Sequence, residues 1–250
     1  MTDELLSFRI MVASGTQAER ELFSRAASAS TVLVEIIEAD AGDAAHKTVA
    51  AGIDIVLLDK ELGGDIVGQV ASAARAAPQP PFTVLLSGQD ADGAFSTDAL
   101  ATKPANFDQA KLLMGKLMRV RLSSRVLVVD SSPAIRGIVR KILLATRFPL
   151  DVAEADRGSE AMQMASHTEF DIVFIDENLP GFSALEVMAE LRRERPATAF
   201  VLITAANEKT AVEEARLHGA AFLKKPFYLA DMEAVLCRFY GLRALNSQRA

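Results

Sequence analysis

Residues 170–181 read FDIVFIDENLPG, where a short apolar run ends at an acid and a Pro-Gly turn follows. The run from Ile172 to Ile175 is typical of a strand buried on both faces of a parallel sheet. Asp176 then lies at the carboxyl end of that strand, the edge where open α/β sheets bind ligands. A buried carboxylate stays charged only where a cation or hydrogen-bond donors compensate it. Taken alone, a single acid after a strand is more simply interpreted as a turn cap.

The same pattern occurs a second time, in the first half of the chain, where residues 52–60 read GIDIVLLDK. Asp59 and Asp176 close the two copies and lie 117 residues apart. This spacing is the size of a domain and is too long for a solenoid repeat. In a chain of 250 residues it predicts two domains, residues 1–121 and 125–250.

Composition narrows the class of protein. Half of the residues are apolar and Trp is absent, so both cores are expected to consist mainly of Ala, Val, Ile and Leu. The net charge of −6 and the pI near 5.2 argue against a nucleic-acid partner. Cys237 is the single cysteine, which excludes an internal disulfide and fits a small buried side chain in a reducing compartment. The start is acidic and no apolar run reaches about 18 residues, so we expect a cytoplasmic protein without a membrane partner.

Apolar runs and helical patterns alternate in both halves. This predicts an α/β fold of two tandem (βα)5 units, each with a doubly wound parallel sheet. The predicted strands are 8–13, 32–37, 53–58, 82–86, 100–101, 126–129, 150–155, 172–175, 199–203 and 221–223. The predicted helices are 16–29, 44–51, 66–77, 107–120, 133–146, 158–167, 184–195, 209–218 and 231–244. Thr16 and Glu19 have the spacing of a capping box at the first of these helices.

Four polar side chains of the second half follow predicted strands. Asp130 comes after the first strand, Asp176 after the third, Thr204 after the fourth and Lys225 after the fifth. In a parallel sheet these positions converge on one edge. Two carboxylates can hold a hard cation through oxygen, and a hydroxyl and an ammonium can bind the oxygens of a phosphoryl group. One of the carboxylates can also act as a nucleophile.

The residues around these positions read VLVVDSSPAIR at 126–136, DENLPG at 176–181, ITA at 203–205 and FLKKPF at 222–227. In this order they make the sequence resemble the receiver domains of two-component response regulators. With both copies included, the resemblance covers nearly the whole chain as two receivers in tandem. It implies a flavodoxin-like fold in each half.

The resemblance also implies roles for single residues. Asp176 is expected to accept a phosphoryl group from a histidine kinase or a histidine phosphotransfer protein while Mg²⁺ is bound. Thr204 and Lys225 are expected to contact that phosphoryl group. Phe222 is expected to be the switch aromatic, which swings inward when Thr204 moves.

The expected Mg²⁺ ligands are Asp130, Asp176 and the backbone carbonyl of Asn178. The family usually has two adjacent acids after its first strand, whereas here Asp130 is followed by Ser131. We therefore expect Mg²⁺ to bind more weakly than is usual. Glu177 could help to hold the cation, but an exposed loop acid is the simpler interpretation.

The first copy keeps the spacing of the family and loses its chemistry. Asp59, Ser87 and Lys103 occupy the acceptor, hydroxyl and lysine positions, but residues 13–14 are Ala-Ser instead of two acids. Leu100 stands where the switch aromatic would be. We therefore predict a degenerate pseudo-receiver that is not phosphorylated, in which Asp59 and Lys103 form a buried ion pair.

These observations predict a response regulator that is not an enzyme beyond its own phosphorylation and slow dephosphorylation. Ten residues follow Tyr240, so we expect output by contact with an unidentified downstream protein or by passing the phosphoryl group onward. The first domain would fix a partner or a homodimer. A phosphorylation-independent adaptor with two inactive sites is the main alternative. A small phosphatase is a third possibility. The lack of a second acid near Asp176 that could protonate a leaving group argues against it.

Overall fold

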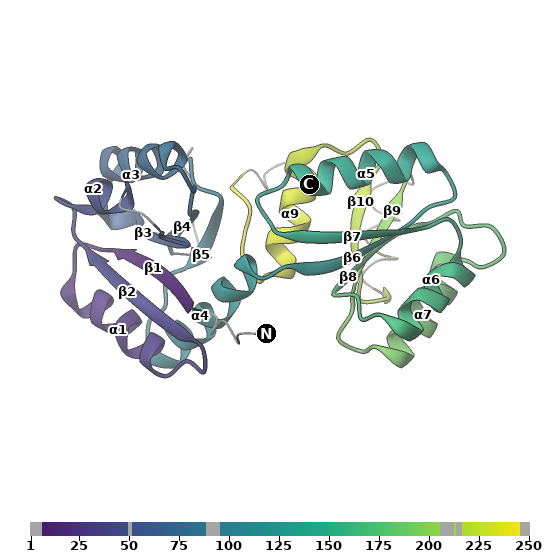
Figure 1. The fold of residues 1–250 in the computed structure, drawn as a ribbon, viewed down its shortest axis with the longest axis horizontal. Coiled ribbons are helices and arrows are strands. Elements are labelled where there is room, and N and C mark those ends of the chain that lie inside the picture. The colour runs from purple at the N-terminus through teal and green to yellow at the C-terminus, as the bar shows by residue number, and fades with distance from the viewer. Residues whose placement is uncertain (1–6, 50–51, 89–95, 206–212, 214–216, 246–250) are drawn as a thin grey trace, which may run out of the picture. The chain divides into compact units, whose positions relative to one another are not determined.

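The structure is a computed structural model and describes residues 7–49, 52–88, 96–205, 213 and 217–245. It divides the chain into two compact units (Figure 1). The first unit comprises Met1–Arg121 together with Tyr240–Ala250, and the second comprises Leu122–Phe239. The predicted range of 125–250 for the second domain differs from this division at its end, because the residues from Tyr240 onward group with the first unit.

Each unit contains a five-stranded parallel sheet. The strands of the first unit lie in the order β2-β1-β3-β4-β5, and those of the second lie in the order β10-β9-β8-β6-β7. Both are the doubly wound order 2-1-3-4-5 of a flavodoxin-like fold, which confirms the predicted fold class. The strands are β1 Ser7–Ala13, β2 Leu33–Ala39, β3 Ile55–Asp59, β4 Phe82–Ser87, β5 Ala99–Thr102, β6 Ser124–Val129, β7 Leu150–Ala155, β8 Ile172–Asp176, β9 Ala199–Thr204 and β10 Ala221–Lys224.

Helices cover both faces of each sheet. In the first unit α1 packs beside α4 and α2 beside α3, and in the second α6 packs beside α7 and α5 beside α9 (Figure 1). The predicted helix at 209–218 lies largely outside the described residues. The helices are α1 Gln17–Ser28, α2 Ala44–Val49, the 3₁₀ turn η1 Lys60–Leu62, α3 Gly64–Ala76, α4 Phe107–Arg121, α5 Pro133–Ala145, α6 Gly158–His167, α7 Ala184–Glu194 and α9 Leu229–Phe239.

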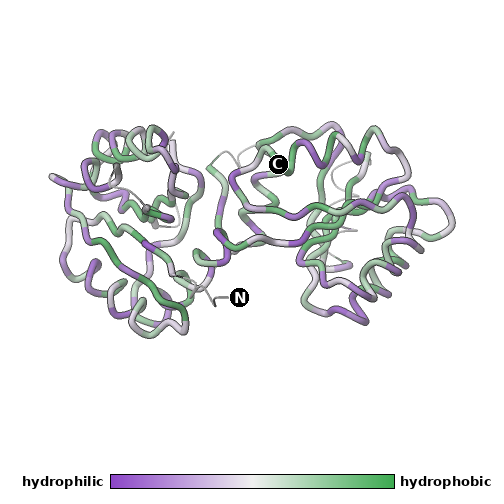
Figure 2. The backbone as a smooth tube through the Cα atoms, in the orientation of Figure 1, coloured by the Kyte–Doolittle hydropathy of each residue, from purple (hydrophilic) through white to green (hydrophobic). Residues whose placement is uncertain are grey.

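The two stretches that define the repeat form the central strands β3 and β8. Every residue of both strands is buried, including the terminal acids Asp59 and Asp176. In Figure 2 the hydrophobic colour gathers on the strands, while the helices alternate between hydrophobic and hydrophilic residues. This pattern is expected where a parallel sheet is covered on both faces.

Two helix starts test the capping predictions. At α5, Ser132 is the N-cap, its side chain accepts a backbone hydrogen bond, and Pro133 lies in the first turn as predicted. At α1, Thr16 is the N-cap but its side chain makes no capping hydrogen bond, so the predicted capping box is wrong. The physical reason is that Glu19 instead accepts from Ser14 and pairs with Lys103.

The last predicted helix, 231–244, is wrong at its end. The helix α9 stops at Phe239, and Gly241 follows with a φ of 71°. Glycine reaches this left-handed conformation without the steric cost that a side chain would add, so the position favours an end to the helix.

The segment after α9 belongs to the core of the first unit. The backbone N–H of Leu100 donates to the carbonyl of Arg243 at 2.7 Å, and the N–H of Arg243 donates to the carbonyl of Leu100 at 2.9 Å. This antiparallel bridge extends the edge of the sheet at β5. Leu242 is buried, and Leu245 packs against the cluster that contains Leu100. We call residues 240–245 the tail.

The structure also bears on the predictions for the single cysteine and for membrane-spanning segments. Cys237 is buried in α9, as expected of a small side chain in a helical pattern. Within the described ranges, no helix combines the length and the apolar character needed to cross a membrane.

Candidate functional site

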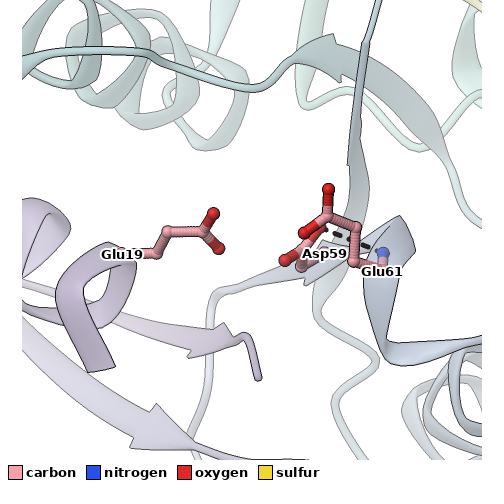
Figure 3. Close-up of side chains that lie close together, drawn as sticks. All are labelled: Glu19, Asp59 and Glu61. Carbon is pink, nitrogen blue, oxygen red and sulfur yellow. Dashed lines mark hydrogen bonds between the residues drawn. The ribbon is translucent and has the colours of Figure 1, made fainter. Parts of the chain in front are cut away.

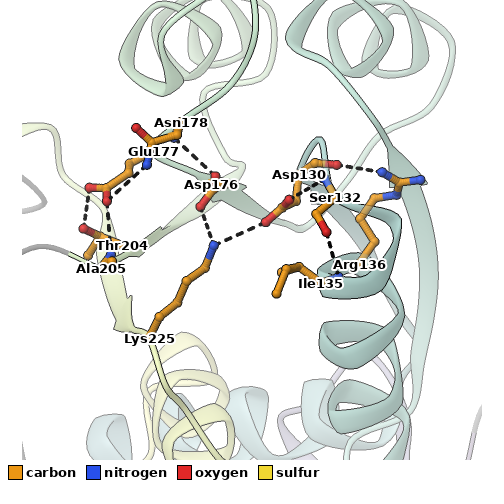
Figure 4. A network of polar contacts seen from close by, with 10 residues as sticks. All are labelled: Asp130, Ser132, Ile135, Arg136, Asp176, Glu177, Asn178, Thr204, Ala205 and Lys225. Carbon is orange, nitrogen blue, oxygen red and sulfur yellow. Dashed lines mark hydrogen bonds and ion pairs between the residues drawn. The ribbon is translucent and has the colours of Figure 1, made fainter.

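The carboxyl ends of the strands of the second unit bring the predicted side chains to one edge. Asp130 directly follows β6, Asp176 ends β8, Thr204 ends β9 and Lys225 directly follows β10. The register pairs Asp176 with Ile203 and Lys224 with Thr204. Figure 4 shows the side chains gathered at this edge, as the strand order predicts.

Lys225 joins the two acids of the site. Its Nζ lies 2.7 Å from Asp176 Oδ1 and 3.4 Å from Asp130 Oδ2. The side chains of Asp176 and Asp130 are only 9% and 3% exposed, whereas that of Lys225 is 27% exposed. Burial alone would lower the pKa of Lys225, but the hydrogen bonds and charges of the two carboxylates outweigh it and raise the pKa. The lysine is therefore a permanent cation at neutral pH.

Backbone groups orient the two acids. Asp130 Oδ1 accepts the backbone N–H of Ser132 at 2.8 Å, and Arg136 donates to the backbone carbonyl of Asp130 at 2.8 Å. Asp176 Oδ2 accepts the backbone N–H of Asn178 at 3.3 Å. Because these donors leave the other carboxylate oxygens facing Lys225, the acids point toward each other across the ammonium (Figure 4).

Thr204 makes a contact that the sequence did not suggest. Its hydroxyl donates to Glu177 Oε2, and the backbone N–H of Ala205 donates to Glu177 Oε1 at 3.1 Å (Figure 4). Thr204 is completely buried, and Glu177 is half-buried. The interpretation of Glu177 as an exposed loop acid is therefore wrong, because its carboxylate satisfies two donors at the end of β9. The one signal in the sequence was the acid directly after Asp176. The sequence does not show whether its side chain extends as far as Thr204.

The remaining predicted residues lie nearby in the chain. Phe222 is half-buried on β10 and pairs in register with Leu202 of β9. Asn178 lies in the loop after β8, where its backbone N–H contacts Asp176 as described above. The roles of these residues as switch and metal ligand stay predictions.

The donor set of the second unit fits a hard divalent cation. Asp130 and Asp176 are two nearly buried carboxylates that face a single ammonium, so one negative charge remains uncompensated between them. Carboxylate and carbonyl oxygens are the ligands that Mg²⁺ prefers. Asp130, Asp176 and the carbonyl of Asn178 are thus the residues that could hold it.

The corresponding edge of the first unit is arranged differently. Lys103 Nζ lies 3.0 Å from Asp59 Oδ2 and 3.1 Å from Glu61 Oε2, and it also contacts Glu19. The predicted pair of Asp59 and Lys103 is therefore present, within a larger cluster that sequence reasoning missed. Glu19 reaches it from α1 and Glu61 from η1 (Figure 3). Carboxylate oxygens of Glu19, Asp59 and Glu61 lie within 4.8 Å of one another.

Lys103 stabilises the charged form of Asp59 in this cluster. Burial would raise the pKa of Asp59, but hydrogen bonds from Lys103 and the backbone of Glu61 outweigh it and lower the pKa. Burial would lower the pKa of Lys103, yet contacts with Glu19, Asp59 and Glu61 raise it. The ammonium therefore stands as a fixed cation among three acids.

The hydroxyl and switch positions of the first site, Ser87 and Leu100, contact the backbone of other residues. The hydroxyl of Ser87 donates to the carbonyl of Gly88 at 3.1 Å. Leu100, at the position of the switch aromatic, is buried and bridges to the tail.

Comparison with known proteins supports the resemblance. Residues 126–236 match the response regulator receiver domain family. The chain is 30% identical over 104 residues to the chemotaxis protein CheY of Listeria monocytogenes, and the match covers 41% of this chain and 87% of that protein. It is 33% identical over 135 residues to a putative transcriptional regulator of Pseudomonas aeruginosa, with 50% and 65% covered. It is 31% identical over 131 residues to the transcriptional regulatory protein PdtaR of Mycobacterium tuberculosis, with 50% and 63% covered. These last two matches thus span less than two thirds of the relatives' own length.

A solved structure matches both units. The crystal structure of a putative two-component system response regulator/GGDEF domain protein covers 94% of this chain and 97% of that chain, with a TM-score of 0.54 and 19% identity. At this identity the match concerns the fold alone.

Proposed function

This chain belongs to the response regulator receiver family, and we propose that its second unit accepts a phosphoryl group on Asp176. The observation that carries the proposal is the position of Lys225, whose ammonium lies between Asp176 and Asp130 at the carboxyl edge of the sheet. This edge is the ligand-binding edge of doubly wound folds.

The proposed donor is a phosphohistidine on a histidine kinase or a phosphotransfer protein. A carboxylate oxygen of Asp176 attacks phosphorus, the P–N bond breaks, and its electron pair stays on the imidazole nitrogen. When the other ring nitrogen of the phosphohistidine carries a proton, the products are an acyl phosphate on Asp176 and a neutral imidazole, so no oxidant or further reactant is needed. Lys225 stays protonated and balances the charge of the transferred group.

Mg²⁺ is the proposed cofactor. Asp130, Asp176 and the carbonyl of Asn178 would hold it, and the bound cation would supply positive charge to the phosphoryl oxygens. Because Ser131 replaces the second acid, the protein itself contributes one carboxylate fewer than is usual in the family. We expect weaker Mg²⁺ binding as a result.

The first unit is proposed to be a pseudo-receiver. Its Lys103 is already paired with three acids, so Asp59 has no free lysine to support an incoming phosphoryl group. We propose that this unit fixes a partner or a second copy of the chain. The phosphorylated second unit then signals by contact with a downstream protein.

A phosphorylation-independent adaptor is the second candidate. Two observations favour it: Ser131 stands at an acid position, and Glu177 already binds the hydroxyl of Thr204. In that case the Asp130→Ala change would leave the affinity for the partner unchanged, since the site would serve no purpose in binding.

Incubation with acetyl phosphate and Mg²⁺, followed by intact mass, distinguishes these functions. We expect one phosphate adduct on the wild type and on Asp59→Asn, and none on Asp176→Asn. An adduct that persists equally on Asp176→Asn, or no adduct on any variant, would overturn phosphorylation of Asp176.

A further inference from the structure

We propose that Glu177 competes with the phosphoryl group for its hydrogen-bond donors, and that it must leave them when Asp176 is phosphorylated. The inference rests on the proposed function of Asp176. It concerns a positioning residue that the expected set of site residues does not include.

Two donors at the end of β9 converge on Glu177. The hydroxyl of Thr204 and the backbone N–H of Ala205 point to the same carboxylate, one to each oxygen of Glu177. Both donors lie at the carboxyl end of β9, next to the strand that ends at Asp176. A hydroxyl and an N–H that converge on two oxygens form an anion-binding pair.

A phosphoryl group on Asp176 would need the donors that Glu177 occupies. A phosphoryl group on Asp176 presents three anionic oxygens at this edge, and Lys225 can satisfy those on its own side. The oxygen that faces β9 needs Thr204 or Ala205, which Glu177 occupies. Because a carboxylate and a phosphoryl group are both oxygen anions, they repel each other if they approach the same donors.

The side chain of Glu177 can move while its backbone stays in place. Its backbone is fixed, because the N–H of Glu177 donates to the carbonyl of Ile203 at 3.0 Å. Only its side chain crosses to Thr204, and the carboxylate is half-buried, so rotation of the side chain frees the donors and leaves the strand intact. The competing group is therefore removable.

Among the described residues of the first unit, this arrangement is not found. Lys60 stands at the position that follows Asp59, and the hydroxyl of Ser87 donates to Gly88. Within the described part of the chain, an acid therefore occupies these donors in the unit whose central acid is expected to react.

Three substitutions at Glu177 separate the effect of its side-chain length from the effect of its charge. Glu177→Ala removes the carboxylate, Glu177→Asp keeps the charge but shortens the reach, and Glu177→Gln keeps the reach but loses the charge. Glu194→Ala is the control, since Glu194 is an exposed acid of α7 that pairs with Arg193. Rates of phosphorylation by acetyl phosphate and the affinity for beryllofluoride are measured for each protein at fixed Mg²⁺.

If Glu177 competes for the donors, Glu177→Ala and Glu177→Asp both react about 10- to 150-fold faster than wild type, the factor that corresponds to one hydrogen bond to a charged group. Glu177→Gln falls between them and the wild type, and Glu194→Ala matches the wild type. Wild-type behaviour of Glu177→Asp together with acceleration in Glu177→Gln would show a plain charge effect and overturn the competition. Equal rates in all five proteins would overturn it as well.

A second readout does not depend on phosphorylation. The ¹H–¹⁵N resonance of the Ala205 amide, without phosphate donor, is expected to shift in Glu177→Ala and Glu177→Asp but not in Glu194→Ala. An unchanged resonance would overturn the contact even if Asp176 reacts. If no protein reacts or binds beryllofluoride, the function proposed for Asp176 fails and the competition fails with it, whatever the amide shows.

Discussion

Lys103 Nζ lies 3.0 Å from Asp59 Oδ2, in the same strand-end positions that Lys225 and Asp176 occupy in the second unit. The two lysines differ in their surroundings, because Lys103 contacts three acids and Lys225 contacts two. In the first unit one ammonium thus stands among three carboxylates, whereas in the second unit one ammonium stands between two.

Replacing Lys103 by Met should destabilise the first unit. Asp59 is 2% exposed and would lose its cation, while Lys103 itself is 22% exposed, so we expect a loss of about 2–4 kcal/mol, below the upper range for fully buried pairs. Chemical denaturation measures it. Lys111→Met, an exposed change on α4, is the control and should stay within about 0.5 kcal/mol of wild type. A loss no larger than that of the control would contradict the cluster.

The stability of the first unit should depend on pH through Asp59. Its pKa is lowered on folding, so the stabilisation that it provides is complete above its unfolded pKa of about 3.9 and is lost as pH falls through the lowered folded value. The pKa of Lys103 is raised, so its contribution is complete below about 10.4 and is lost only at higher pH. Unfolding of wild type and Asp59→Asn should therefore differ most near neutral pH and converge toward pH 3. A constant difference across this range would contradict the assignment.

Gly158→Ala should destabilise the second unit. A Cβ on Gly158, the first residue of α6, would lie 2.5 Å from Val187 Cγ2 of α7, so the two helices must move apart. We expect a loss of about 1–3 kcal/mol in thermal or chemical unfolding. Gly137→Ala in α5 is the matched control, because its Cβ meets nothing within 4 Å and should stabilise the helix by about 0.5–1 kcal/mol. Equal effects at the two glycines would refute the close helix contact.

Restoring the missing acid should strengthen cation binding. Ser131 is exposed next to Asp130, so Ser131→Asp adds a carboxylate where the family usually has one. We expect Mg²⁺ affinity to rise on the order of tenfold, because affinity of oxygen sites grows with ligand charge. Calorimetric titration with Mg²⁺ measures the change. Asp130→Asn should weaken binding in the same assay, and opposite signs in either variant would argue against a cation at this edge.

Truncating Leu242 should weaken the first unit. Leu242 is 5% exposed in the tail, so Leu242→Ala is expected to cost about 2–4 kcal/mol of stability. Leu112→Ala is the control, since Leu112 is 62% exposed on α4 and should change stability by at most about 0.5 kcal/mol. Phosphorylation of Asp176 serves as a second readout and should not change. A loss of stability confined to the second unit would show that the tail does not stabilise the first unit.

The sequence predicted the contacts that follow from the order of the strands. It did not predict the contacts that depend on how far a long side chain extends. Asp130, Asp176 and Lys225 meet because parallel strands bring their carboxyl ends to one edge, which the apolar runs already reveal. Glu177 and Glu19 contribute through long side chains in loops and a first helical turn, where periodicity carries no information about direction. The end of α9 was missed for a related reason, because the apolar pattern of the helix continues into the tail, whose Leu242 and Leu245 belong to the core of the first unit.

The bridge between Leu100 and Arg243 has a practical consequence for dissecting the protein. A fragment cut after Arg121 would leave behind Leu242 and Leu245, and with them part of the wall that closes the interior of the first unit. Its edge strand would then present bare backbone donors and acceptors, the condition that promotes association of sheets. Work on that unit in isolation should therefore supply the missing segment as a separate peptide or join it through a new loop.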